Sequence, residues 1–247
     1  MKMKKILTAG ALVKEVIYTR AAGREPAKVR AAKRKASTEA QQLMNAKYSW
    51  QKLELMLAAN FVPGDLVVTL TYDDEHLPAD RTAALARLKK FRADLTAARR
   101  KRGQELRMIW TTENVHEGGR WHHHMVINAT GKDFGEISRF WDCGADLEIR
   151  KLELSRDRNY ESLARYMCKE ARERPGLRSW SYTRSCRHPE VEVFSVPDDA
   201  VLEPPEDATV LEDVAKRTEY GEFRFLKYLA AKPVKLRRQR RGMRRRR

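Results

Sequence analysis

The sequence has few cysteines, no long apolar run and no phosphate-binding glycine loop. Its three cysteines, Cys143, Cys168 and Cys186, are too few and too widely spaced for a disulfide framework, so we expect a reducing, cytoplasmic compartment. No stretch approaches the roughly 20 apolar residues of a membrane-spanning helix, and the apolar part of the charged N-terminus is interrupted by Lys14 and Glu15. We therefore expect neither a membrane partner nor export. No loop ends in Gly-Lys-Ser or Gly-Lys-Thr, so a fused ATP-driven helicase is not expected.

Basic residues are abundant and concentrated. The 247 residues carry 51 Lys and Arg against 34 Asp and Glu, a net charge of +17. Residues 232–247 hold ten basic side chains and no acidic one, and residues 20–35 hold seven with only Glu25 opposing them. Such blocks typically neutralise phosphates without reading sequence, which predicts a nucleic-acid partner and DNA contacts by Arg244, Arg245, Arg246 and Arg247. The alternatives are solubilising charge and a tether to a membrane surface.

Three consecutive histidines form the most specific motif. His122, His123 and His124 precede an apolar run with strand character and follow a Gly118-Gly119 pair, which predicts a β-hairpin. Alternate residues of a strand share a face, so His122 and His124 point together and His123 points away. Counting outward from a two-residue glycine turn sets Val115 opposite His122 and Glu113 opposite His124. Two imidazoles and a carboxylate with open positions predict a catalytic site for Mg²⁺ or Mn²⁺. The alternative is a structural histidine cluster.

A candidate nucleophile lies downstream. Residues 159–171 have helical periodicity, and the spacing of Tyr166 and Lys169 puts a phenol and an ammonium on one helical face. Because a free tyrosine has a pKa near ~10, attack on phosphorus at neutral pH requires a nearby cation or a metal-activated phosphate. Alone the pattern is weak, since a half-buried tyrosine beside a solvated lysine gives the same spacing.

Taken in order, these motifs resemble those of the HUH endonucleases, specifically the single-tyrosine rolling-circle replication initiators of phages and plasmids. Residues 66–72 resemble the first-motif strand of that family, and Thr69 and Thr71 on it are expected DNA contacts. Arg120 either contacts DNA phosphate or is a solvent-exposed turn residue. The middle residue of the family's His-hydrophobic-His motif is here His123, which leaves open which two histidines bind metal. The resemblance covers roughly half of the chain, from about residue 61 to about residue 174.

The resemblance implies a metal-dependent, site-specific DNA nickase and ligase. His122, His124 and Glu113 would hold the divalent metal, Tyr166 would form a 5′-phosphotyrosine link and release a 3′-hydroxyl that primes synthesis, and Lys169 would stabilise the phenolate. The expected partners are single-stranded or hairpin origin DNA and the helicase and polymerase of a bacterial host cell. The alternatives are an HUH transposase, a non-catalytic DNA-binding regulator and a hydrolytic enzyme for small phosphates.

The pattern of elements predicts an α+β fold, an HUH or ferredoxin-like (RRM-like) sandwich whose central antiparallel sheet is flanked by helices. We expect strands at 11–20, 105–112, 120–128, 145–154 and 178–186, and helices at 37–60, 81–102 and 134–141. Residues 210–218 indicate a helix, and residues 222–229 a strand or a helix. We divide the chain into an N-terminal segment (1–60), an endonuclease domain (61–188), an extension with an acidic, proline-rich linker (189–231) and a basic tail (232–247).

Overall fold

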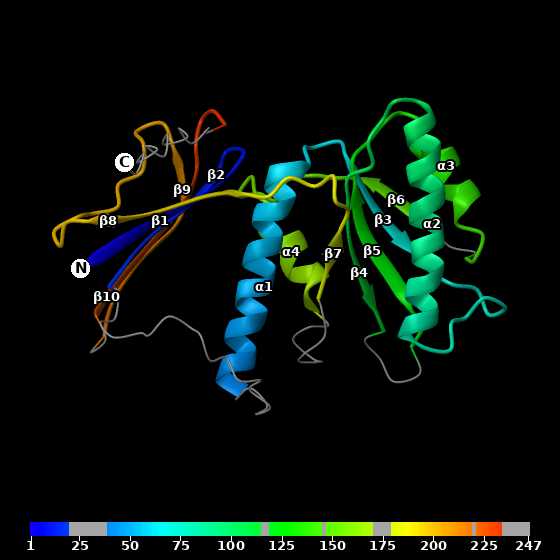
Figure 1. Ribbon diagram of the computed structural model, residues 1–247, viewed down its shortest axis with the longest axis horizontal. Coiled ribbons are helices and arrows are strands. Elements are labelled where there is room, and N and C mark those ends of the chain that lie inside the picture. Colours follow the sequence, from blue (N-terminus) through cyan, green and yellow to red (C-terminus); the bar gives the residue numbers. More distant parts are fainter. Residues whose placement is uncertain (20–38, 115–118, 145–146, 170–178, 219–220, 234–247) are drawn as a thin grey trace, which may run out of the picture. The chain divides into compact units, whose positions relative to one another are not determined.

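The computed structural model describes residues 1–19, 39–114, 119–144, 147–169, 179–218 and 221–233. The chain divides into two compact units, the first formed by residues 1–28 and 189–247 and the second by residues 29–188. Each unit contains a five-stranded antiparallel sheet (Figure 1). The fold class is α+β, as predicted, and it is compatible with a ferredoxin-like or HUH sandwich.

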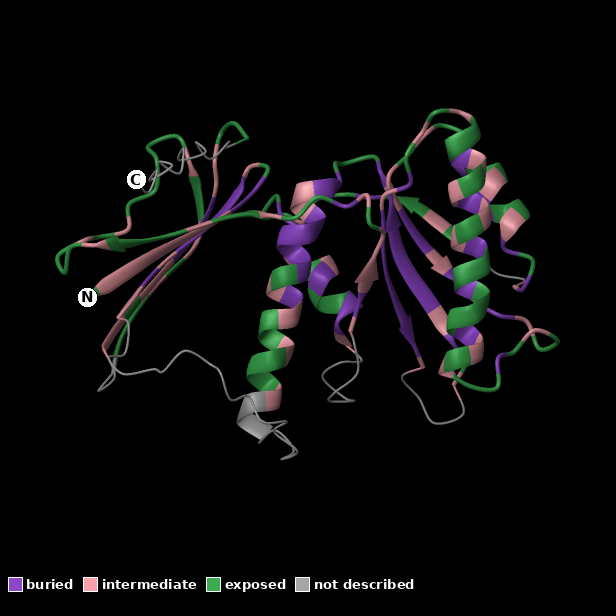
Figure 2. Ribbon diagram, in the orientation of Figure 1, coloured by how far each residue is buried: buried purple, intermediate pink, exposed green. Residues whose placement is uncertain are grey.

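The sheet of the second unit has the strand order β6-β3-β5-β4-β7. Its strands are β3 (Leu66–Leu70), β4 (Met108–Glu113), β5 (His122–Ile127), β6 (Leu147–Lys151) and β7 (Ser181–Tyr182). The central strands β4 and β5 are almost entirely buried (Figure 2). The helices of this unit are α1 (Glu39–Asn60), α2 (Arg81–Lys101), α3 (Asp133–Phe140) and α4 (Glu161–Met167).

Helices α2 and α3 cover one face of this sheet, and α1 and α4 lie on the other (Figure 1). Helix α2 begins where Asp80 accepts a hydrogen bond from the amide of Ala83 at 2.8 Å, and its buried stripe repeats every three to four residues. The stripe packs on one side chain in every two along β3, β4 and β5, including Val68 and Met125. The intervening side chains, including Val67 and Val126, pack against α1 and α4. Both faces of the strands are therefore apolar in their middle parts.

The sheet of the first unit has the order β8-β1-β2-β10-β9 and combines the two ends of the chain. Its strands are β1 (Lys2–Ala9), β2 (Leu12–Thr19), β8 (Glu190–Val196), β9 (Thr209–Thr218) and β10 (Gly221–Leu229). A two-residue turn joins β1 to β2, and Gly10 occupies it with a φ of 62°. Val13, Leu226 and Tyr228 form the centre of a small apolar cluster on this sheet.

The structure corrects several details of the sequence prediction. The segment predicted as a helix at 210–218 is strand β9, because it pairs with β10 along its length. Strands β1 and β8 were not predicted. Helix α4 begins two residues later than expected and ends at Met167, whereas Ala171 lies outside the described residues. Strand β7 has only two residues where 178–186 was predicted. The predicted strands at 11–20, 120–128 and 145–154 are confirmed in shorter form.

Candidate active site

Two adjacent strands bring Glu113, His122 and His124 to one face of the sheet. Glu113 pairs with His122 and Thr111 with His124. The predicted register was therefore wrong by two residues, because β4 and β5 end before the glycine pair and a longer connection replaces a two-residue turn. Val115 and Gly118 lie outside the described residues. A shift of two preserves the side-chain face, so Glu113 still lies on the face of His122 and His124, as predicted.

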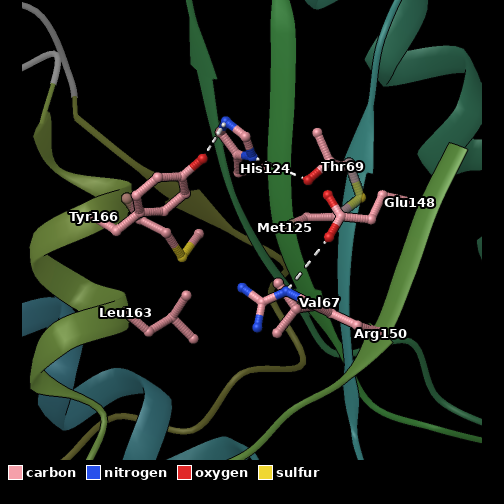
Figure 3. Close-up of a pocket in the computed structure, with 9 residues that line it drawn as sticks. Val67, Thr69, His124, Met125, Glu148, Arg150, Leu163 and Tyr166 are labelled. Atoms are coloured by element: carbon pink, nitrogen blue, oxygen red, sulfur yellow. Dashed lines mark hydrogen bonds and ion pairs between the residues drawn. The ribbon is translucent and has the colours of Figure 1, made fainter. Parts of the chain in front are cut away.

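His124 is the centre of the contacts at this site. Its Nε2 lies 2.7 Å from Glu113 Oε1 and 3.4 Å from the hydroxyl of Tyr166, and its Nδ1 lies 3.2 Å from Thr69 Oγ1. The rings of His124 and Tyr166 meet edge to face with centroids 5.1 Å apart. Figure 3 shows Tyr166 reaching from α4 towards His124, with Thr69 on the other side of the imidazole. The structure therefore brings strand and helix motifs together.

Glu113 is a buried carboxylate with a free oxygen. Its exposed fraction is 2%, and its Oε1 accepts a hydrogen bond from Lys169 Nζ at 2.8 Å. Its Oε2 is buried and has no hydrogen-bond partner among the described residues. Burial raises the pKa of Glu113, but the hydrogen bonds from His124 and Lys169 outweigh it and the net pKa lies below its usual value. Glu113 is therefore an anion at neutral pH with one oxygen available for a cation.

The donor set fits a divalent metal ion in kind. The imidazoles of His122 and His124 are stacked, with centroids 6.3 Å apart. Burial first, and then the neighbouring His124, lower the pKa of His122, so it is neutral and able to bind metal near pH 7. As the side chains lie, the described residues contain no group of three or more His, Cys, Asp or Glu arranged to hold a metal ion. A metal ligated by His124 Nε2 requires its direct contact with Glu113 to open.

His123 has a different environment on the opposite face. It is fully buried, and its Nε2 lies 2.7 Å from the hydroxyl of Tyr72 while its Nδ1 lies 2.8 Å from Thr112 Oγ1. Burial, reinforced by the adjacent histidines, lowers the pKa of His123 to about 3. Both ring nitrogens therefore serve hydrogen bonds that hold the core, which leaves His122 and His124 as the histidines on the face of Glu113.

Tyr166 and Lys169 come from α4 and the residues directly after it. The side chain of Tyr166 is 45% exposed, and the ammonium of Lys169 lies 4.5 Å from the centroid of its ring. Burial lowers the pKa of Lys169, but the hydrogen bond and the charge of Glu113 outweigh it, and the net pKa is raised. An accessible phenol thus lies beside a permanent cation, the proximity that the Tyr-x-x-Lys spacing predicts.

The other predicted DNA contacts are not gathered at this point. Arg120 donates a hydrogen bond to the carbonyl oxygen of Tyr72 at 2.9 Å and forms an ion pair with Asp74, so part of its hydrogen-bonding capacity is used within the loop. Thr69 contacts His124, and Thr71 lies just beyond the end of β3, where its carbonyl oxygen accepts a hydrogen bond from Trp141. Arg244, Arg245, Arg246 and Arg247 lie outside the described residues.

A hollow of about 350 Å³ opens beside Tyr166 and His124. Two of its lining residues, Glu148 and Arg150, come from the edge strand β6 and belong to none of the sequence motifs (Figure 3). The predicted strand at 145–154 contained the signal for them, because residues two apart on a strand share a face. What was missing is that β6 pairs with β3 and so lies on the same side of the sheet face as the site.

Residues 65–173 match a family model of replication-associated proteins, the ORF2 type. This stretch contains Glu113, the histidine triplet, Tyr166 and Lys169, and it lies within the second unit. Over these residues the chain is similar to proteins associated with replication, which agrees with a rolling-circle role. Neither the curated proteins nor the solved structures include a match to the chain. None of the described helices is both long enough and apolar enough to cross a membrane.

Proposed function

We propose that the protein is an HUH-type endonuclease that nicks and rejoins single-stranded or hairpin origin DNA to initiate rolling-circle replication. The observation that carries the proposal is the contact of the Tyr166 hydroxyl with His124 beside the buried Glu113 and the cation of Lys169. It lies in the stretch similar to replication-associated proteins. An accessible phenol, a carboxylate with a free oxygen and a fixed cation suit attack on a phosphodiester.

In the proposed reaction the Tyr166 oxygen attacks the phosphorus in line while the bond from phosphorus to the 3′ oxygen breaks. The phenol gives up its proton and the departing 3′ oxygen takes up one, so no net proton is consumed. Lys169 favours the phenolate because its ammonium lies beside the ring. His122, His124 and Glu113 would hold Mg²⁺ or Mn²⁺, which supplies positive charge to polarise the scissile phosphate. The 5′-phosphotyrosine conserves the bond energy, and attack by a 3′-hydroxyl rejoins the strand.

The proposed partners follow from this reaction. Tyr166 needs direct access to the backbone, so the DNA must be single-stranded or extruded from a duplex at the origin. The sequence contains no Gly-Lys-Ser or Gly-Lys-Thr loop to drive strand separation, and the released 3′-hydroxyl requires a polymerase. We therefore place the protein in the cytoplasm of a bacterial host cell, where the helicase and polymerase of the host supply these activities.

The deciding experiment is detection of a covalent protein–DNA adduct. Purified protein is incubated with Mn²⁺ and labelled single-stranded fragments that tile the DNA flanking its gene, and adducts are resolved on a denaturing gel. We expect an adduct that disappears in Tyr166→Phe and in chelator. Tyr48→Phe is the matched control, because Tyr48 is also an exposed phenol, on α1.

Two results would overturn the proposal. One is an adduct that persists in Tyr166→Phe. The other is wild-type protein that binds the tiled DNA but neither cuts it nor forms an adduct, which would indicate a DNA-binding regulator.

A further inference from the structure

The hollow beside Tyr166 has a polar wall and an apolar wall. The polar wall is formed by Glu148 and Arg150, which are two residues apart on β6 and point to the same side. The apolar wall includes Leu163 of α4, with Val67 of β3 at the base. Figure 3 shows the carboxylate and the guanidinium directed into the space that Tyr166 and Leu163 border from the helix side.

The size and lining suit one flat heterocycle. At ~30 Å³ per water molecule, a volume of this size corresponds to roughly a dozen waters, about the number of non-hydrogen atoms in a purine base. The apolar side chains of Val67 and Leu163 can contact the faces of a ring, while Glu148 and Arg150 can meet its polar edge. This combination of a stacked face and a hydrogen-bonded edge is how proteins hold an unstacked base.

The charge of Glu148 decides which part of a nucleotide enters. A carboxylate repels phosphate, and it lies here on the wall of a hollow in a chain whose net charge is +17. The backbone of the DNA is therefore excluded from this wall, whereas an uncharged base with N–H donors is attracted to it. A second hollow of about 300 Å³, which shares Val67, Arg150, Leu163 and Tyr166, continues along β6 and leaves room for the adjoining nucleotide.

The spacing of the two charged groups favours one base. Arg150 Nε lies 3.8 Å from Glu148 Oε1, too far for a hydrogen bond, and both side chains are more than half exposed. The pair presents two carboxylate acceptors beside guanidinium donors. Guanine carries two adjacent N–H donors next to a carbonyl acceptor on its Watson–Crick edge, and the other three bases lack that pair of adjacent ring and amino donors.

We propose that this hollow is a guanine-binding subsite for a nucleotide next to the phosphate that Tyr166 attacks, with Glu148 accepting from the base and Arg150 donating to it. The proposal rests on the proposed function for the identity of the ligand as single-stranded DNA. It assigns to β6 the part of origin recognition that depends on sequence, separate from the phosphate-neutralising basic blocks.

The test is a binding measurement in chelator, where no cleavage takes place. Fluorescence anisotropy compares a labelled oligonucleotide of twelve thymines with oligonucleotides of the same length that carry one central guanine, adenine or cytosine. We expect the full-length protein to prefer guanine by about tenfold, the discrimination typical of a bidentate base contact. Glu148→Gln and Arg150→Ala should lose this preference and keep the affinity for the thymine oligonucleotide within about twofold.

Matched controls remove the same charges elsewhere in the second unit. Glu105→Gln changes an exposed carboxylate before β4, and Arg139→Ala changes a guanidinium on α3, which packs on the other face of the sheet. Both should retain the guanine preference. The proposal is overturned if the wild type shows no preference for guanine, or if the preference survives in both Glu148→Gln and Arg150→Ala.

The adduct experiment separates this inference from the proposed function. An adduct without guanine preference leaves the nickase standing and removes the subsite. Guanine preference without any adduct leaves a base-reading hollow in a protein that does not nick DNA.

Discussion

At the level of single residues, the three adjacent histidines show how strand geometry divides one motif between two tasks. His123 joins the core between Tyr72 and Thr112, whereas His122 and His124 face Glu113. The sequence predicts this division from alternation alone. It does not predict the direct contact between His124 and Glu113, because that contact depends on the register of β4 against β5.

Replacing His123 should affect stability and not metal binding. In His123→Ala the hydroxyls of Tyr72 and Thr112 lose their buried partner, so we expect the free energy of unfolding to fall by about 2 to 4 kcal/mol. Urea unfolding measures this loss, and titration calorimetry measures the Mn²⁺ affinity of the folded variant. We expect that affinity to be unchanged in His123→Ala and at least about tenfold lower in His122→Ala. A folded His123→Ala protein that no longer binds Mn²⁺ would contradict the assignment.

Lys169 should act through the charge state of Tyr166. Without the ammonium beside its ring the phenol is harder to ionise, so Lys169→Met should slow adduct formation on the order of tenfold at neutral pH, the effect of one pKa unit. The deficit should shrink as the pH rises towards 10, because the phenolate then forms without help.

The adduct-formation rate is followed from pH 6 to pH 10, and Lys169→Arg, which retains a cation, should recover most of it. A loss of equal size at every pH would instead indicate a purely structural role through Glu113.

At the level of elements, local periodicity is sufficient to predict most helices and strands of the second unit. The stripe of α2, with Leu88, Phe91 and Leu95, is readable in sequence because it repeats at helical spacing. The predicted turn at the glycine pair was wrong because turn chemistry alone does not reveal where a ladder ends. Glu148 and Arg150 were missed for a related reason, since only the pairing of β6 with β3 brings them to the site.

Strand β9 shows where local preference fails. Its sequence from Val210 to Thr218 includes Leu, Glu, Ala and Lys, all good helix formers, and yet it lies at the edge of a sheet beside β10. Tertiary pairing overrides propensity here. Strand β1 escapes prediction because its lysines resemble the charged start of a leader, although Lys2 and Lys4 alternate with Met3 and Lys5 along a regular ladder.

A buried ion pair between α2 and α3 gives the second unit a predictable dependence on acid. Arg99, whose side chain is fully buried, donates a hydrogen bond to Asp133 at 2.8 Å, and Thr130 and Gly131 donate backbone hydrogen bonds to the same carboxylate. Burial raises the pKa of Asp133, but these hydrogen bonds and Arg99 outweigh it and the net pKa is lowered. The associated stability is therefore complete above the unfolded-state pKa of ~3.9 and is lost as the pH falls through the lower folded-state pKa.

Asp133→Asn should lower the free energy of unfolding at neutral pH by about 3 kcal/mol, because it leaves the guanidinium of Arg99 buried without its counter-charge. The difference from the wild type should narrow below about pH 4. Denaturant unfolding between pH 2 and pH 7 measures both effects. Asp94→Asn is the control, since Asp94 pairs with Lys90 on the exposed side of α2. Curves that stay parallel down to pH 2 would count against the pair as the source.

At the level of the whole molecule, the excess positive charge is separate in sequence from the site. The ten basic residues of 232–247 lie outside the stretch similar to replication-associated proteins. We expect a chain that ends at Ala231 to bind single-stranded DNA more weakly at low salt, with a shallower dependence of log affinity on log salt. The slope should fall by about 0.7 for every phosphate that the tail no longer neutralises. Anisotropy titrations at several salt concentrations measure the slope.

A chain in which residues 232–247 are replaced by glycine and serine controls for length. At saturating DNA the rate of adduct formation should equal that of the wild type, because the tail neutralises phosphates and takes no part in the attack. An unchanged salt slope would show that the tail does not bind the DNA.

The pairing of the two chain ends in one sheet also sets an order of events during synthesis. Lys2 of β1 pairs with Val196 of β8, so β1 and β2 leave the ribosome as a bare hairpin, which is marginally stable at best. At ~5–20 residues per second they wait on the order of 10 s or longer for their partner strands. Residues 29–188 emerge as a whole in that interval. The nascent chain therefore assembles its tyrosine and histidine site before its own first strands have a sheet to join.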